Sequence, residues 1–170
     1  MIAAFVFVVF PLCLAMAAAS DLLTMTIPNR VSLLMAAAFL IIAPLAGLPI
    51  AAIAMSLLAA LIVFAVCFAL FASNIMGGGD AKLLSATALW FGFTQSQLLF
   101  VSAVGLFGGV LTFAILLMRT QSNTILAMGL PLPNSLILAK KIPYGIAIAA
   151  GGFVAFPSSP IFMTTLEALK

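Results

Sequence analysis

The sequence contains very few charged residues. Only 5% of its 170 residues are Asp, Glu, Lys or Arg, whereas about a quarter of the residues of a soluble domain are charged. Hydrophobic residues make up 66% of the chain, and the mean hydropathy is +1.43. A soluble fold of this length cannot hide so much apolar surface from water. The composition therefore excludes a soluble globular protein and predicts an integral membrane protein.

Histidine is absent, and there are only two cysteines. Without histidine, neither acid–base catalysis nor metal binding through an imidazole is available. Cys13 and Cys67 both fall inside apolar runs, where we expect them to pack as small core residues without forming a disulfide. Two cysteines cannot supply the four ligands of a structural zinc site. We therefore expect no metal and no cofactor.

Long apolar runs dominate the remaining sequence. They are continuous and lack the alternation of barrel strands, so we expect an all-α, polytopic membrane bundle. A helix needs about 20 apolar residues to cross a bilayer core. We predict about six transmembrane helices, over residues 2–19, 31–46, 50–72, 80–93, 97–118 and 143–156. The first has room for a further turn past Asp21. With no repeat and no soluble segment, residues 1–170 are expected to form one membrane-embedded domain.

The basic residues predict the orientation of these helices. With six helices, five of the six basic residues fall in connections on one side: Arg30, Lys82, Arg119, Lys140 and Lys141. The connections on the other side, residues 44–50 and 94–96, carry no charge. Lys and Arg are enriched in cytoplasmic loops, so this side is expected to face the cytoplasm, with the N-terminus outside. Residues 119–141 are expected to form a surface connection, or an interfacial or re-entrant segment.

Two of the three acidic residues, Asp21 and Asp80, are predicted on this same face. Taken singly, each suits a helix cap, and Asp80 after three glycines resembles an N-cap. Taken together, two close carboxylates suit aspartic-protease hydrolysis, because they share one proton. The ionised group takes a proton from the attacking water, and the protonated group donates to the oxyanion or the leaving amine. Residues 77–79 would allow unusual backbone conformations and close approach of a substrate.

The residues alone leave another class of function open. Acidic residues within a membrane also mark ion or proton paths, and glycine breaks mark the interrupted helices of transporters. A small transporter or channel subunit therefore fits the intramembrane acids about as well as a protease does. Gly105 and Gly109 have the spacing of a close helix contact, within the bundle or in a dimer, and the oligomeric state is not predicted.

Three motifs in this order resemble the type IV prepilin peptidase family. They are "SDLLTMTIPNR" at residues 20–30, "GGGDAKLL" at 77–84 and "KIPYGIAIAAGG" at 141–152. The second matches the GxGD signature of membrane-embedded aspartyl proteases. The chain is similar to the short prepilin peptidases of tight-adherence (Tad, Flp pilus) systems. Long members carry a cytoplasmic insertion with two CxxC pairs, linked to N-methylation, which this chain lacks, so methyltransferase activity is not expected.

The resemblance implies an aspartic endopeptidase that cuts the leader of a type IV or Flp prepilin, or of a pseudopilin, at the cytoplasmic face of the bacterial inner membrane. It implies that Asp21 and Asp80 are catalytic. Further residues match the supporting motifs: Ile27, Pro28, Asn29, Gly77, Gly78, Gly79 and Lys82. Lys82 is expected to balance negative charge, to meet a substrate carboxylate or to anchor the helix at the membrane surface.

The partners implied are the membrane-bound precursor and the lipid bilayer, and no nucleic acid. A non-enzymatic subunit of a pilus or secretion assembly is the remaining alternative. The assembly-subunit hypothesis predicts that changing both aspartates to asparagine leaves function intact, whereas the protease hypothesis predicts loss of cleavage.

Overall fold

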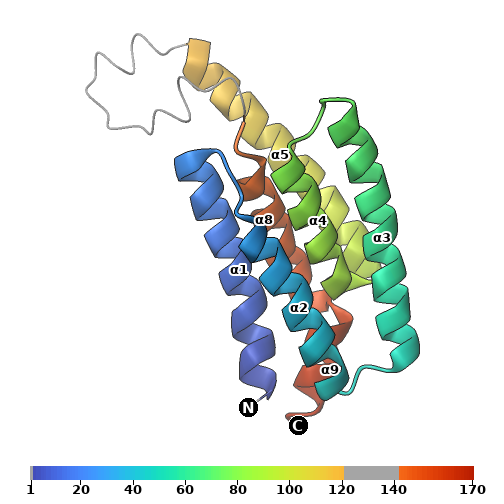
Figure 1. The fold of residues 1–170 in the computed structure, drawn as a ribbon. Helices are drawn as coiled ribbons and strands as arrows, with labels where there is room; N and C mark the ends of the chain where they lie inside the picture. The colour runs from blue at the N-terminus through green and yellow to red at the C-terminus, as the bar shows by residue number, and fades with distance from the viewer. Residues whose placement is uncertain (1, 121–141) are drawn as a thin grey trace.

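The fold is a bundle of helices that run up and down past one another (Figure 1). The computed structural model describes residues 2–120 and 142–170, and no strand occurs among them. The elements are α1 (Ile2–Thr24), α2 (Asn29–Leu45), α3 (Ile50–Ala72), α4 (Gly78–Phe91), α5 (Gln95–Thr120), α8 (Tyr144–Ala155), the 3-10 helix η1 (Phe156–Ser158) and α9 (Pro160–Glu167). The predicted all-α, polytopic membrane bundle is confirmed.

Four stretches are long and apolar enough to cross a membrane. They are α1, α3, α5 and the stretch Tyr144–Glu167, which runs from α8 to α9. The helix α2 is a shorter apolar helix of 17 residues. The helix α4 has 14 residues, which corresponds to about 21 Å at 1.5 Å per residue. Its shortness is as predicted, and it lies among the other helices.

The predicted ends of the helices agree with the structure to within a few residues, with two corrections. Helix α4 begins at Gly78, with Gly77 as its N-cap, so Asp80 is the third helical residue and not the cap. The chain after Phe156 is also helical, because Ser159 caps α9 by accepting a hydrogen bond from the Phe162 N–H at 3.3 Å. We had predicted no helix there.

Helix α4 lies in the middle of the bundle and buries nine of its 14 residues. It packs against α2, α3, α5, α8 and α9. Near its end, the Trp90 ring lies among the rings of Phe10, Phe39 and Phe156. The indole N–H of Trp90 donates to the Met35 carbonyl oxygen at 3.2 Å. This aromatic cluster fixes α4 against α1, α2 and η1.

Small residues also contribute to the packing, but not all of those predicted. Cys13 and Cys67 are buried in the apolar core, which confirms their predicted packing role. Gly105 and Gly109 are exposed, and a Cβ added at either would meet no atom within 4 Å. These two glycines therefore make no close helix contact within the described residues, and a contact in a dimer stays a prediction. Gly108 is the buried glycine of α5, and it contacts the Tyr144 ring of α8.

The turns alternate between the two ends of the bundle (Figure 1). The terminal end holds both chain termini and the turns after α2 and α4. The opposite end, called here the aspartate end, holds the turns after α1 and α3. Arg30, Lys82 and Arg119 lie in the parts of α2, α4 and α5 nearest the aspartate end, as predicted. Lys140, Lys141 and the connection 121–141 lie outside the described residues.

Candidate active site

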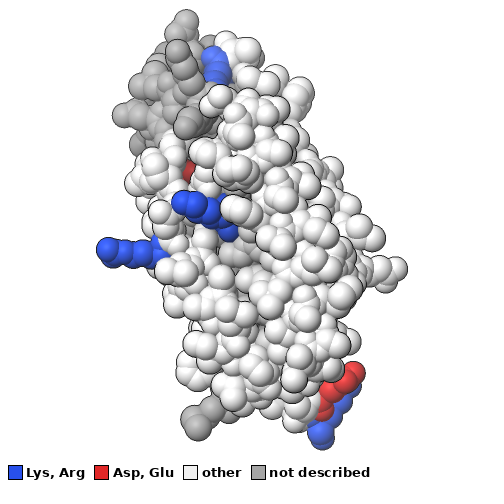
Figure 2. Space-filling view, turned by 45° about the vertical axis from the view of Figure 1, so that its right-hand side comes forward, with Lys and Arg blue, Asp and Glu red and all other residues white. Residues whose placement is uncertain are grey.

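A cavity of about 260 Å³ lies at the aspartate end, and both predicted aspartates line it. Its wall is formed by Asp21, Met25, Thr26, Ile27, Asn29, Gly77, Gly78, Gly79, Asp80 and Ile142. These residues come from the end of α1, the turn into α2, the start of α4 and the segment before α8. Figure 2 shows a small red carboxylate surface recessed among white atoms near blue basic side chains. The fold thus brings four separate segments to one polar site.

Asp21 lies in the last turn of α1 and is only 5% exposed. Its Oδ2 atom accepts a hydrogen bond from the backbone N–H of Gly145 at 2.7 Å. A buried carboxylate needs such a donor, because burial removes the water that would otherwise solvate it. The helix ends shortly after, where Met25 takes a φ of +54°. This turn in the backbone directs the next residues across the cavity.

Asp80 is half-buried in the first turn of α4. A carboxylate at this position is stabilised by the positive end of the helix dipole. Its Oδ2 atom lies close to the N-cap residue, since a Cβ added at Gly77 would be 2.8 Å from it. The side chain therefore folds back over the start of its own helix, at the cavity wall.

The three glycines before Asp80 allow neighbouring residues to pack closely, and they do not adopt an unusual backbone conformation. Among the described residues, only Gly47 and Gly92 are glycines with positive φ, so our expectation for residues 77–79 was wrong in this respect. A Cβ added at Gly79 would lie 3.2 Å from the Cβ of Ile27. The first turn of α4 therefore packs directly on the turn after α1.

The remaining motif residues link α2 to α4. Pro28 is the N-cap of α2, with extended backbone, and Ile27 beside it is buried. The amide oxygen of Asn29 accepts a hydrogen bond from the Lys82 ammonium group at 2.9 Å. Pro28 and Lys82 do not line the cavity, whereas all the other predicted site residues do. The two motifs are thus joined at the cavity's edge.

Sequence reasoning missed several residues of this site. Met25, Thr26 and Ile142 line the cavity, and Gly145 contacts the Asp21 carboxylate. The segment around Gly145 was noted for its motif, but no role in the site was assigned to it. As for metal binding, no three His, Cys, Asp or Glu side chains gather within residues 2–120 and 142–170.

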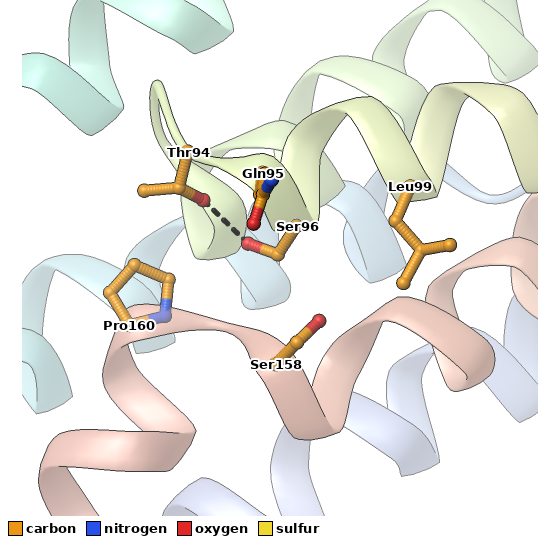
Figure 3. Close-up of a pocket in the computed structure, with 6 residues that line it drawn as sticks. All are labelled: Thr94, Gln95, Ser96, Leu99, Ser158 and Pro160. Carbon is orange, nitrogen blue, oxygen red and sulfur yellow. Dashed lines mark hydrogen bonds between the residues drawn. The ribbon is translucent and has the colours of Figure 1, made fainter.

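A second cavity, of about 510 Å³, lies at the terminal end (Figure 3). It is lined by Thr94, Gln95, Ser96, Leu99, Ser158 and Pro160. The hydroxyl groups of Thr94 and Ser96 are 2.6 Å apart and bond to each other. None of its lining side chains is ionisable at neutral pH, so this cavity offers no group for acid–base catalysis.

Comparison with known proteins gives one match. A family model described as the type IV leader peptidase family matches residues 8–115, which is more than half of the chain. The matched range includes both aspartates and ends before α8. No curated protein and no solved structure matches the chain significantly.

Proposed function

The chain belongs to the type IV leader peptidase family, and from that premise we propose that it is an aspartic endopeptidase in which Asp21 and Asp80 cut the leader from prepilins. Membership supports a prepilin-type peptidase role, and the apolar helices support a multi-pass membrane protein. The observation that carries the catalytic assignment is the shared cavity lined by the two carboxylates. Glu167, the third acidic residue, lies in α9 at the terminal end.

The proposed reaction needs only the two carboxylates and one water molecule. The ionised carboxylate accepts a proton as the water oxygen attacks the scissile carbonyl carbon. The protonated carboxylate hydrogen-bonds to the developing oxyanion and then transfers its proton to the leaving nitrogen as the C–N bond breaks. The products are a new carboxyl group and a new amine. Because the two groups share protons, they titrate as one unit.

The position of the cavity supports a substrate that stays in the membrane. A precursor whose apolar helix lies in the bilayer presents its leader near the membrane surface, and the cavity lies at one end of the bundle. Arg30, Lys82 and Arg119 lie at the same end, and basic residues favour the cytoplasmic side. We therefore place the cavity at the cytoplasmic face of the inner membrane, with the N-terminus outside. The proposed substrates are type IV prepilins, Flp prepilins and pseudopilins.

The test is cleavage of a prepilin in membranes by the wild type, Asp21→Asn and Asp80→Asn. Each substitution should lower the cleavage rate about 10²- to 10⁴-fold, because each removes a group that transfers a proton. Glu167→Gln is the matched control, since it removes the only other acidic residue, which is exposed and in α9. It should cleave at the wild-type rate.

The amount of each variant in the membrane is measured alongside cleavage. If either aspartate variant is inserted normally and still cleaves the precursor, the two-aspartate mechanism is wrong. A transporter, a channel or a non-enzymatic assembly subunit would then explain the acids better.

A further inference from the structure

We propose that Gly145 is a positioning residue of the active site, whose backbone N–H holds the Asp21 carboxylate in the cavity. The inference rests on the proposed function, in which Asp21 is catalytic. It extends that site to α8, a helix that lies beyond the matched residues 8–115. The catalytic apparatus would then need a segment that the family match does not include.

The contact itself is short and buried. The Gly145 nitrogen lies 2.7 Å from Asp21 Oδ2, and both residues are buried. Gly145 is the second residue of α8, and N–H groups in the first turn of a helix have no partner within that helix. This N–H is therefore free to donate to a group outside α8.

Only glycine fits at this position without moving the carboxylate. A Cβ added at residue 145 would lie 2.9 Å from both the Cβ and the Oδ2 atoms of Asp21. It would also lie 3.1 Å from the Cδ1 atom of Ile27. A larger residue must therefore displace the Asp21 side chain and press against the tip of the Ile27 side chain.

The start of α8 is itself held in place from the other side. The Tyr144 ring packs into the space that Gly108 leaves on α5, where an added Cβ would overlap the ring. Pro143, the N-cap residue of α8, is buried. Helix α8 packs against both α5 and α1, so the Gly145 N–H is held in place beside Asp21. The carboxylate thus has a rigid donor that selects one orientation.

The first experiment compares Gly145→Ala with Gly152→Ala in a cleavage assay. Both glycines lie in α8 against α1, and a Cβ added at Gly152 would lie 2.5 Å from Leu14 Cδ1, the flexible tip of a core side chain. Misplacement of a catalytic group costs up to about 10²-fold. We expect kcat of Gly145→Ala to fall about 10- to 100-fold with KM nearly unchanged, and kcat of Gly152→Ala to change by less than about 3-fold.

Thermal unfolding midpoints of both variants show whether packing alone explains a loss. If Gly145→Ala cleaves as fast as Gly152→Ala, or if both lose kcat in proportion to lost stability, the positioning role is wrong. An inactive Asp21→Asn beside a fully active Gly145→Ala overturns this inference alone. An active Asp21→Asn overturns the proposed function and the positioning role with it.

The second experiment observes the hydrogen bond without any catalysis. The protein is labelled with ¹⁵N-glycine, and the Gly145 amide signal is the one missing from Gly145→Ala. Donation to a carboxylate shifts an amide proton downfield, so Asp21→Ala should move this signal upfield more than any other glycine signal. Asp80→Ala should leave it nearly in place. A Gly145 signal that is unmoved in Asp21→Ala would show that the bond is absent.

Discussion

At the scale of single residues, one side-chain hydrogen bond joins the two aspartate motifs. The Lys82 ammonium group bonds to the Asn29 amide oxygen at 2.9 Å. This bond joins the fifth residue of α4, two positions after Asp80, to the first residue of α2. Both side chains are exposed, so water competes for the bond and its net contribution is modest. Lys82 is thus assigned a supporting role, and not a chemical one.

This assignment predicts a partial loss of activity on changing Lys82. Lys82→Met should slow cleavage about 2- to 10-fold, which corresponds to the loss of a hydrogen bond worth about 0.5–1.5 kcal/mol. Lys82→Gln keeps a hydrogen-bond donor and should cleave at close to the wild-type rate. The measurement is the initial rate of precursor cleavage. A loss as large as that of the aspartate variants would instead show that Lys82 takes part in the chemistry.

At the scale of the helices, α4 carries Asp80 at one end and the aromatic cluster at the other. The cluster anchors this helix by ring contacts around Trp90 and by the bond from Trp90 to the Met35 carbonyl. Trp90 is fully buried, and Asp80 lies ten residues before it, at the other end of the helix. The residues that stabilise α4 and the residue proposed to act in cleavage therefore lie at opposite ends of the helix.

A substitution at Trp90 should affect stability and leave chemistry intact. Trp90→Phe loses the hydrogen bond and part of the buried ring, which should lower the free energy of unfolding by about 1–3 kcal/mol. Denaturation in detergent measures this change. Phe93→Leu, at a half-exposed ring near the same end, is the control and should change stability by less than about 0.5 kcal/mol. Cleavage by folded Trp90→Phe should match the wild type, and loss without unfolding would contradict this separation.

Most of the helices were predictable from local signals in the sequence. The bounds of α3 are as predicted, because Pro49 precedes a long apolar run and polar residues follow it. The start of α9 was missed although its signal is local: Ser159 caps the helix and Pro160 follows at its first position, which favours a helix start. The predicted last helix ends at Phe156, before this signal.

The site was predictable only in part. Asp21, Asp80 and the residues of their two motifs could be named because each motif is a short continuous stretch. The contact of Gly145 with Asp21 joins residues 124 positions apart, and no local pattern encodes it. The close fit of Gly79 against Ile27 is likewise a product of packing. These two contacts depend on how the helices pack in the tertiary structure, and not on the local helix propensity of the sequence.

At the scale of the whole molecule, the two ends of the bundle differ in charge and in the cavities they carry. The aspartate end holds the site and three of the described basic residues, whereas the turns after α2 and α4 at the terminal end are uncharged. If the aspartate end is cytoplasmic, as basic residues favour, the two ends face different compartments.

Labelling of single cysteines tests this orientation. Ile75→Cys lies in the turn before α4, and Phe93→Cys lies in the turn before α5, and both native side chains are exposed. In intact cells, an impermeant maleimide should label Phe93→Cys and spare Ile75→Cys until the membrane is opened. Cys13 and Cys67 are buried and should give little background. The opposite labelling pattern would reverse the proposed orientation.

The bond between Asp21 and Gly145 also bears on how the enzyme is made. Translation releases α1 from the ribosome long before α8, and the carboxylate has no Gly145 donor until the later helix has entered the membrane and packed. Long-range contacts of this kind form slowly, because a large loop must close first. A nascent chain therefore carries an unfinished site. Under the proposed positioning role, a chain whose synthesis has not yet passed α8 should cleave a precursor more slowly than the finished protein.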